Sequence, residues 1–144
     1  MNIEILKSLV AAVALGISSS ACAADVVVYK TPTCGCCTKW VEHMREKGFK
    51  LTVHEIPDVT PIKAEQGLPY GLGSCHTALV DGYVVEGHVP ADAIQRLLSE
   101  RPKVKGIAVP GMPAGSPGME GDHSDPYDLL TFDENGKTEI YESR

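Results

Sequence analysis

The sequence predicts an α/β protein in which a central mixed β-sheet is flanked by helices. Two observations carry this prediction. Segments with the two-residue period of strands alternate along the chain with segments that have the 3.6-residue period of helices. The dipeptide Asp81-Gly82 separates two short apolar runs, a pattern typical of a tight β-hairpin. With 144 residues, the chain has the length of a single domain.

The first half of the predicted domain contains strand, helix, strand and short helix. Residues 26–30 (VVVYK) are a β-branched run typical of a buried strand. Residues 36–47 have a helical pattern, and residues 49–53 alternate apolar and polar side chains as a strand with one buried face does. Residues 60–67 predict a short helix with Thr60 as its N-cap, followed by a first-turn proline.

The second half continues with a hairpin and an amphipathic helix. Residues 77–80 and 83–85 are the predicted strands on either side of the Asp-Gly turn. Residues 90–100 form an amphipathic helix, which the following Arg101-Pro102 brings to an end. By analogy, this order of strands and helices is that of a thioredoxin-like domain.

Two further segments follow this core. Residues 106–121 (GIAVPGMPAGSPGMEG) are rich in glycine and proline and low in charge, so they predict an ordered loop or a wrapping arm and no regular helix. Residues 129–132 and 138–141 flank a turn sequence, which predicts a C-terminal hairpin.

The N-terminal segment is typical of a secretory signal peptide. A basic residue precedes a short apolar run at residues 9–17, and Ala21 and Ala23 form an A-x-A cleavage pattern. The run is shorter than the roughly 20 residues that span a bilayer. We therefore expect residues 1–23 to be removed on export to the periplasm, leaving residues 24–144 as a thioredoxin-like domain. A buried N-terminal helix is the alternative.

The charge pattern narrows the class of partner. The formal net charge is −6, and no basic stripe is present. Because nucleic-acid binding depends on neutralising phosphates with Lys and Arg, this composition argues against a nucleic-acid partner. After signal cleavage no apolar run that could cross a membrane is left, so we expect no membrane association of the mature chain.

The cysteines form the most informative pattern. Cys22 lies in the predicted signal peptide, whereas Cys34, Cys36, Cys37 and Cys75 belong to the domain. Two structural disulfides are the usual expectation for four cysteines in an exported protein, but three of these lie within four residues. The C-G-C-C motif contains a C-x-x-C at a predicted helix start, where thiolates are favoured. A third sulfur in the same turn suits a soft metal, and thiolates select Cu(I), zinc and Fe–S clusters.

Topology brings further candidates to this motif. Cys75 begins the third predicted strand, beside the loop after the first strand, and should face the C-G-C-C turn. His88 ends the fourth predicted strand, which returns beside Cys75, and is a candidate ligand. His76 should point the opposite way by strand alternation. Met112 and Met119 offer thioether sulfur, although core packing is the commoner use of methionine.

At these residues the chain resembles a known family. The segments YKTPTCGCCTKWVEHM (residues 29–44), SCHTALVDGYVVEGHVP (74–90) and VPGMPAGSPGME (109–120) are similar to those of CopG-type copper-resistance proteins. The resemblance implies a periplasmic, thioredoxin-like protein of copper homeostasis. It also implies that the four cysteines of the domain are its metal-binding thiols.

The resulting interpretation is a periplasmic copper-binding protein of copper resistance that prefers Cu(I). Bridging sulfurs are expected if several copper ions bind, because sharing thiolates lowers the charge repulsion, and cycling between Cu(I) and Cu(II) is compatible with an exported site. The expected partners are copper ions and other periplasmic copper-resistance proteins. Two alternatives stay open: a thiol–disulfide oxidoreductase using Cys34 and Cys37, and a structural zinc site.

Overall fold

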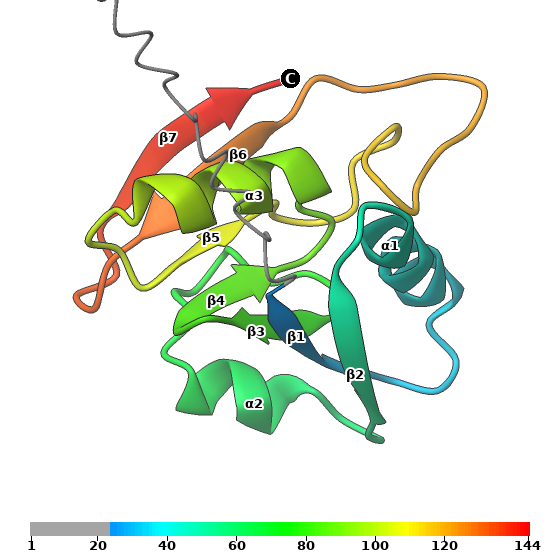
Figure 1. Ribbon diagram of the computed structural model, residues 1–144, viewed down its shortest axis with the longest axis horizontal. Helices are drawn as coiled ribbons and strands as arrows, with labels where there is room; N and C mark the ends of the chain where they lie inside the picture. Colours follow the sequence, from blue (N-terminus) through cyan, green and yellow to red (C-terminus); the bar gives the residue numbers. More distant parts are fainter. Residues whose placement is uncertain (1–23) are drawn as a thin grey trace, which may run out of the picture.

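The structure, a computed structural model, describes residues 24–144. The predicted signal peptide, residues 1–23, lies outside the described residues. One seven-stranded mixed sheet has the order β2-β1-β3-β4-β5-β6-β7 (Figure 1). In chain order the elements are β1 (Asp25–Lys30), α1 (Gly35–Glu46), β2 (Lys50–Glu55), α2 (Thr60–Glu65), β3 (Thr77–Val80), β4 (Tyr83–Glu86), α3 (Ala91–Glu100), β5 (Gly106–Ala108), β6 (Asp128–Phe132) and β7 (Thr138–Ser143).

The two faces of the sheet carry different helices. Helices α1 and α3 pack on one face through Trp40, Met44, Ile94 and Leu97, all fully buried. The opposite face carries α2 (Figure 1) and a smaller apolar cluster that includes Phe132. The predicted mixed α/β fold class is confirmed, and so is the order of elements from β1 to α3. The thioredoxin-like description stays an interpretation of that order.

The central strands place the two cysteine-bearing segments side by side. Strand β1 pairs in parallel with β2 and antiparallel with β3. The loop after β1 and the segment before β3 therefore lie at the same end of the sheet. The β3–β4 hairpin turns at Asp81 and Gly82, which have φ values of 46° and 86°. Positive φ at both positions is what the predicted two-residue turn requires.

The short helix α2 begins differently from the prediction. Val59 is its N-cap, and Thr60 is already helical. The side chain that serves the helix start is Asp58, whose Oδ1 accepts the Thr60 backbone N–H at 2.9 Å. The predicted cap was therefore one residue too late, and the Thr60 N–H is bonded to Asp58, which lies two residues upstream.

The Gly/Pro-rich segment is partly a strand, which the sequence prediction missed. Gly106–Ala108 forms β5, parallel to β4 and antiparallel to β6. A Cβ on Gly106 would lie 2.2 Å from the Val84 carbonyl oxygen, so only glycine permits this close approach. Residues 109–121 are irregular, as predicted, and Figure 1 shows this yellow-to-orange segment passing close to α1 before it returns to β6.

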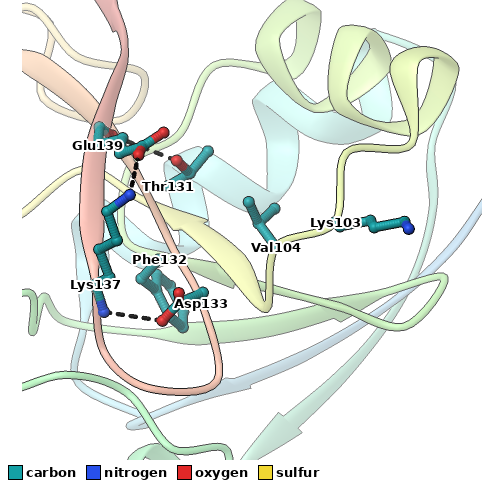
Figure 2. Close-up of a pocket in the computed structure, with 7 residues that line it drawn as sticks. All are labelled: Lys103, Val104, Thr131, Phe132, Asp133, Lys137 and Glu139. Atoms are coloured by element: carbon teal, nitrogen blue, oxygen red, sulfur yellow. Dashed lines mark hydrogen bonds and ion pairs between the residues drawn. The ribbon is translucent and has the colours of Figure 1, made fainter.

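The predicted C-terminal hairpin is confirmed as β6 and β7. In its turn, Asp133 Oδ1 accepts the backbone N–H groups of Asn135 and Lys137 at 2.8 and 2.9 Å. A cavity of about 170 Å³ lies beside this hairpin (Figure 2), and no cysteine or histidine lines it. Within residues 24–144, no helix combines the length and the apolar character needed to span a membrane.

Candidate metal centre

Four cysteine sulfurs meet where the start of α1 approaches the segment before β3. The Sγ atoms of Cys34, Cys36, Cys37 and Cys75 all lie within 4.8 Å of one another. The prediction that Cys75 faces the C-G-C-C turn is therefore confirmed. Four sulfurs at such separations could share a single ion or bridge several.

Local backbone geometry brings three of these sulfurs to one helix start. Cys34 is the N-cap of α1, with an extended backbone, and its N–H donates to the Thr31 carbonyl at 3.3 Å. Cys37 is fully buried, whereas Cys34 and Cys36 are half-buried. The first turn of α1 contains no acidic residue. Unpaired amides at a helix start favour thiolate over thiol, so this turn suits anionic sulfur.

A disulfide joins Cys34 and Cys37, whose Cα atoms are 5.3 Å apart. Cys36 and Cys75 are free thiols. The Sγ of Cys36 lies 3.5 Å from that of Cys34 and 3.7 Å from that of Cys75. Cys36 thus lies between the disulfide and the thiol of Cys75. While the disulfide is present, two of the four sulfurs, those of Cys36 and Cys75, are available as ligands.

Burial controls the protonation of Cys75. Desolvation raises the pKa of its thiol to about 11, with a smaller opposing contribution from the Ser74 hydroxyl. Cys75 therefore keeps its proton at neutral pH in the metal-free protein. A soft metal ion would have to displace this proton, which couples binding to proton release.

His88 is oriented toward Cys75 by a backbone carbonyl. Its Nδ1 lies 2.7 Å from the Pro117 oxygen, which can only accept, so Nδ1 carries the proton. Its Nε2 lone pair then faces the Cys75 sulfur at 2.9 Å. Burial lowers the pKa of His88, which keeps the ring neutral. A metal-ligating histidine in proteins usually donates its second N–H in this way.

The position of His88 differs in detail from the prediction. Strand β4 ends at Glu86, and Gly87, with φ of 75°, bends the chain so that His88 turns back toward Cys75. A Cβ on Gly87 would lie 2.6 Å from the Ser74 Cβ, so this bend needs glycine. His88 was predicted near the site, and its proximity to Cys75 is confirmed.

The prediction for His76 was wrong. Its ring lies on the cysteine side, with Nδ1 3.5 Å from the Cys75 sulfur and the ring centroid 4.4 Å from that of Trp40. Strand alternation does not apply, because β3 begins only at Thr77. Burial lowers the pKa of His76 well below its ordinary value. Cys75, His76 and His88 thus form a second group of donor atoms within 4.8 Å.

The irregular arm, residues 109–121, covers this cluster of cysteines and histidines. The Met112 sulfur lies 3.9 Å from that of Cys36, and the Met112 residue is half exposed. Met119 contributes backbone bonds to a turn of the arm, donating to the Ser116 oxygen at 2.8 Å. Gly118 packs against the start of α1 so closely that a Cβ would lie 2.6 Å from the Cys36 oxygen. The arm's glycines were the only sequence signal for this packing.

A mixed α/β domain that gathers four cysteine sulfurs and a neutral histidine at a helix start defines a class of cysteine-cluster proteins suited to soft metals. Comparison with known proteins narrows this class. A solved structure of the copper resistance protein CopG, form 2, is 43% identical with a TM-score of 0.81, covering 85% of this chain and 98% of that chain. A second solved structure of the same protein, form 1, is 44% identical with a TM-score of 0.79, covering 83% of this chain and 96% of that chain. The chain belongs to the CopG family of copper resistance proteins.

The comparisons with family models and with curated protein sequences add less information about the family. The family model described as a protein of unknown function, DUF411, matches residues 72–119. That range contains Cys75, His76, His88 and both arm methionines, but not the C-G-C-C motif. No curated protein sequence matches the chain.

Proposed function

We propose that this chain binds copper as Cu(I) in the periplasm and contributes to copper resistance. The proposed ligands are Cys34, Cys36, Cys37, Cys75 and His88. The observation that carries the proposal is the convergence of four cysteine sulfurs within 4.8 Å in a member of the CopG family. Thiolate and imidazole are the ligand types that soft Cu(I) selects.

The disulfide imposes an order on copper binding. Cys34 and Cys37 must first take up two electrons and two protons from an external dithiol, which is itself oxidised to a disulfide, to become thiols. Binding of Cu(I) then releases protons, since thiolate is the ligating form. Four thiolates around one ion would leave a large negative charge, so bridging of several Cu(I) ions by shared sulfurs is electrostatically favoured.

The place of action and the partners belong to the same proposal. The signal-peptide pattern of residues 1–23 supports export to the periplasm, where copper-resistance proteins that deliver or receive the metal would be the partners. Removal of residues 1–23 would leave the described domain intact, because β1 begins at Asp25. N-terminal sequencing of the periplasmic protein should give Ala24 or Asp25.

Metal analysis tests the copper proposal. Protein purified without oxygen from copper-fed cells should contain copper in excess of zinc, and should compete with a Cu(I) chelator only after reduction of the disulfide. Zinc as the dominant metal under these conditions would instead support a structural zinc site.

One observation favours a second candidate function. The Cys34–Cys37 disulfide at the start of α1 has the C-x-x-C spacing and the position used by thiol–disulfide oxidoreductases. Turnover of a disulfide substrate by metal-free protein, combined with no measurable Cu(I) affinity, would establish this alternative and overturn the copper proposal.

A further inference from the structure

Glu86, at the end of β4, is a fully buried carboxylate that the proposed copper ligands do not include. Its Oε1 accepts the Ser74 backbone N–H at 2.8 Å, and its Oε2 accepts the Thr77 hydroxyl at 2.6 Å. Lys63 of α2 forms an ion pair with the same carboxylate. A buried charge is tolerated only when it is paired and hydrogen-bonded in this way.

Two hydrogen-bond partners of Glu86 flank Cys75 in the sequence. Ser74 comes directly before Cys75, and Thr77 follows it by two positions. Both ends of the segment that carries Cys75 are thus held by one carboxylate group. Lys63 Nζ also donates to the Thr77 hydroxyl at 3.0 Å, which closes the network.

This segment has little other regular structure to hold it. Residues 68–76 precede β3 and form turns and bends. Besides Glu86, residues 74–76 bond to other segments through the His76 oxygen, which accepts the Gly87 N–H at 3.0 Å, and through the Ser74 hydroxyl, which donates to the Gly111 oxygen at 2.5 Å. The Cys75 sulfur nevertheless has to lie 3.7 Å from that of Cys36, on a different element. An ionised carboxylate accepts from several donors at once and so fixes such a loop more strongly than a neutral acceptor does.

We propose that Glu86, neutralised by Lys63, is a positioning residue that clamps residues 74–77 and so sets the distance of the Cys75 sulfur from Cys36. Its consequence for copper rests on the proposed function: without the clamp, the fourth sulfur is no longer pre-organised and Cu(I) affinity falls. The effect on sulfur geometry does not depend on any metal.

Two double variants separate positioning from bulk stability. Lys63→Met with Glu86→Leu removes both charges and the acceptor oxygens, and losing both partners of a buried pair is tolerated far better than losing one. Lys63→Met with Glu86→Gln also removes both charges but keeps one acceptor oxygen, and serves as the conservative rescue. Lys137→Met with Glu139→Leu is the matched control, since that pair lies on the exposed β6–β7 hairpin at 2.6 Å (Figure 2).

The metal-free readout is crosslinking of Cys36 to Cys75 by dibromobimane, with the Cys34–Cys37 disulfide intact. This reagent becomes fluorescent only when it bridges two thiols. We expect the crosslinking rate to fall at least about tenfold in the Leu double variant, because the hydrogen bonds that Ser74 and Thr77 donate to a charged group are both lost. The Gln double variant should recover most of the rate, and the control should match the unmodified protein.

The second readout is Cu(I) affinity of the reduced variants by chelator competition, with thermal unfolding as the check on folding. An unchanged crosslinking rate in the folded Leu double variant would overturn the clamp. If that variant does not fold, Thr77→Val decides, because it removes one donor to Glu86 and keeps the ion pair: an unchanged rate again overturns the proposal. Absence of Cu(I) binding by the unmodified protein would refute the proposed function. The crosslinking rates would still test whether Glu86 positions Cys75, because that measurement needs no metal.

Discussion

Gly118 is the position where one added methyl group tests whether the arm is needed at the candidate metal centre. Its φ is 93°, and a Cβ would lie 2.6 Å from the Cys36 oxygen, 3.1 Å from the Trp40 nitrogen and 3.2 Å from His88 Nδ1. Two of these three atoms belong to the backbone of α1 and cannot yield. Gly118→Ala should therefore lift the arm away from the start of α1.

The size of this effect can be separated into two parts. A side chain at this φ costs roughly 1–2 kcal/mol through backbone strain. Forcing a methyl group into a closely packed site costs about a further 1–3 kcal/mol. Gly48, with φ of 90° and nothing within 4 Å of its Cβ position, isolates the first part. Gly48→Ala should thus cost roughly 1–2 kcal/mol and Gly118→Ala about 2–5 kcal/mol.

Thermal unfolding of the two variants is the assay. At about 4 °C per kcal/mol for a domain of this size, Gly118→Ala should lower Tm by roughly 8–20 °C and Gly48→Ala by roughly 4–8 °C. Displacing the arm also removes the Pro117 oxygen from His88, so Cu(I) affinity should fall about 10–100-fold in Gly118→Ala alone. Equal Tm values and equal Cu(I) affinities in the two variants would refute the claim that the arm packs on the centre.

Three other substitutions test the ligands and the surface charge. Cys36→Ser should abolish tight Cu(I) binding and leave the C-x-x-C dithiol able to oxidise, and unchanged copper stoichiometry would contradict this. His88→Ala should weaken Cu(I) binding about tenfold or more in chelator competition, whereas an unaltered affinity would exclude ligation by its Nε2. The hydrogen bond from Arg144 lowers the pKa of Asp92, so this carboxylate stabilises the fold above its ordinary pKa of about 4 and loses that contribution as pH falls. Asp92→Asn should therefore cost less than about 1 kcal/mol at pH 7, because the pair is largely exposed, and the difference should shrink in denaturant titrations near pH 3.

Local sequence patterns predicted the helices and strands well where residues close together in the sequence determine the structure. The β-branched run of β1, the helical face of α1 and the Asp-Gly turn of the β3–β4 hairpin each depend on neighbours within a few residues. Strand β5 escaped prediction for the opposite reason. Its three residues are strand only because β4 and β6 lie on either side and supply the hydrogen bonds.

The histidines show the limit of sequence reasoning at the site. Alternation along a strand is a local rule, and it failed at His76 because that residue lies just before β3. His88 reached Cys75 through a bend at Gly87, whose glycine is needed because Ser74, 13 residues earlier in the chain, occupies the space of a side chain. Neither ring orientation could be derived from the residues nearby.

The sequence by itself determined which sulfurs could gather, because cysteine spacing and the start of a helix are local properties: three sulfurs lie in one turn, and a fourth lies two residues before a strand. Only the tertiary structure decided which other groups join them. Met112, the carbonyl of Pro117 and the Glu86 carboxylate come to the centre from the arm and from β4. These contacts form between segments distant in sequence, where burial and hydrogen bonding across the whole fold select one arrangement among many that local preference allows.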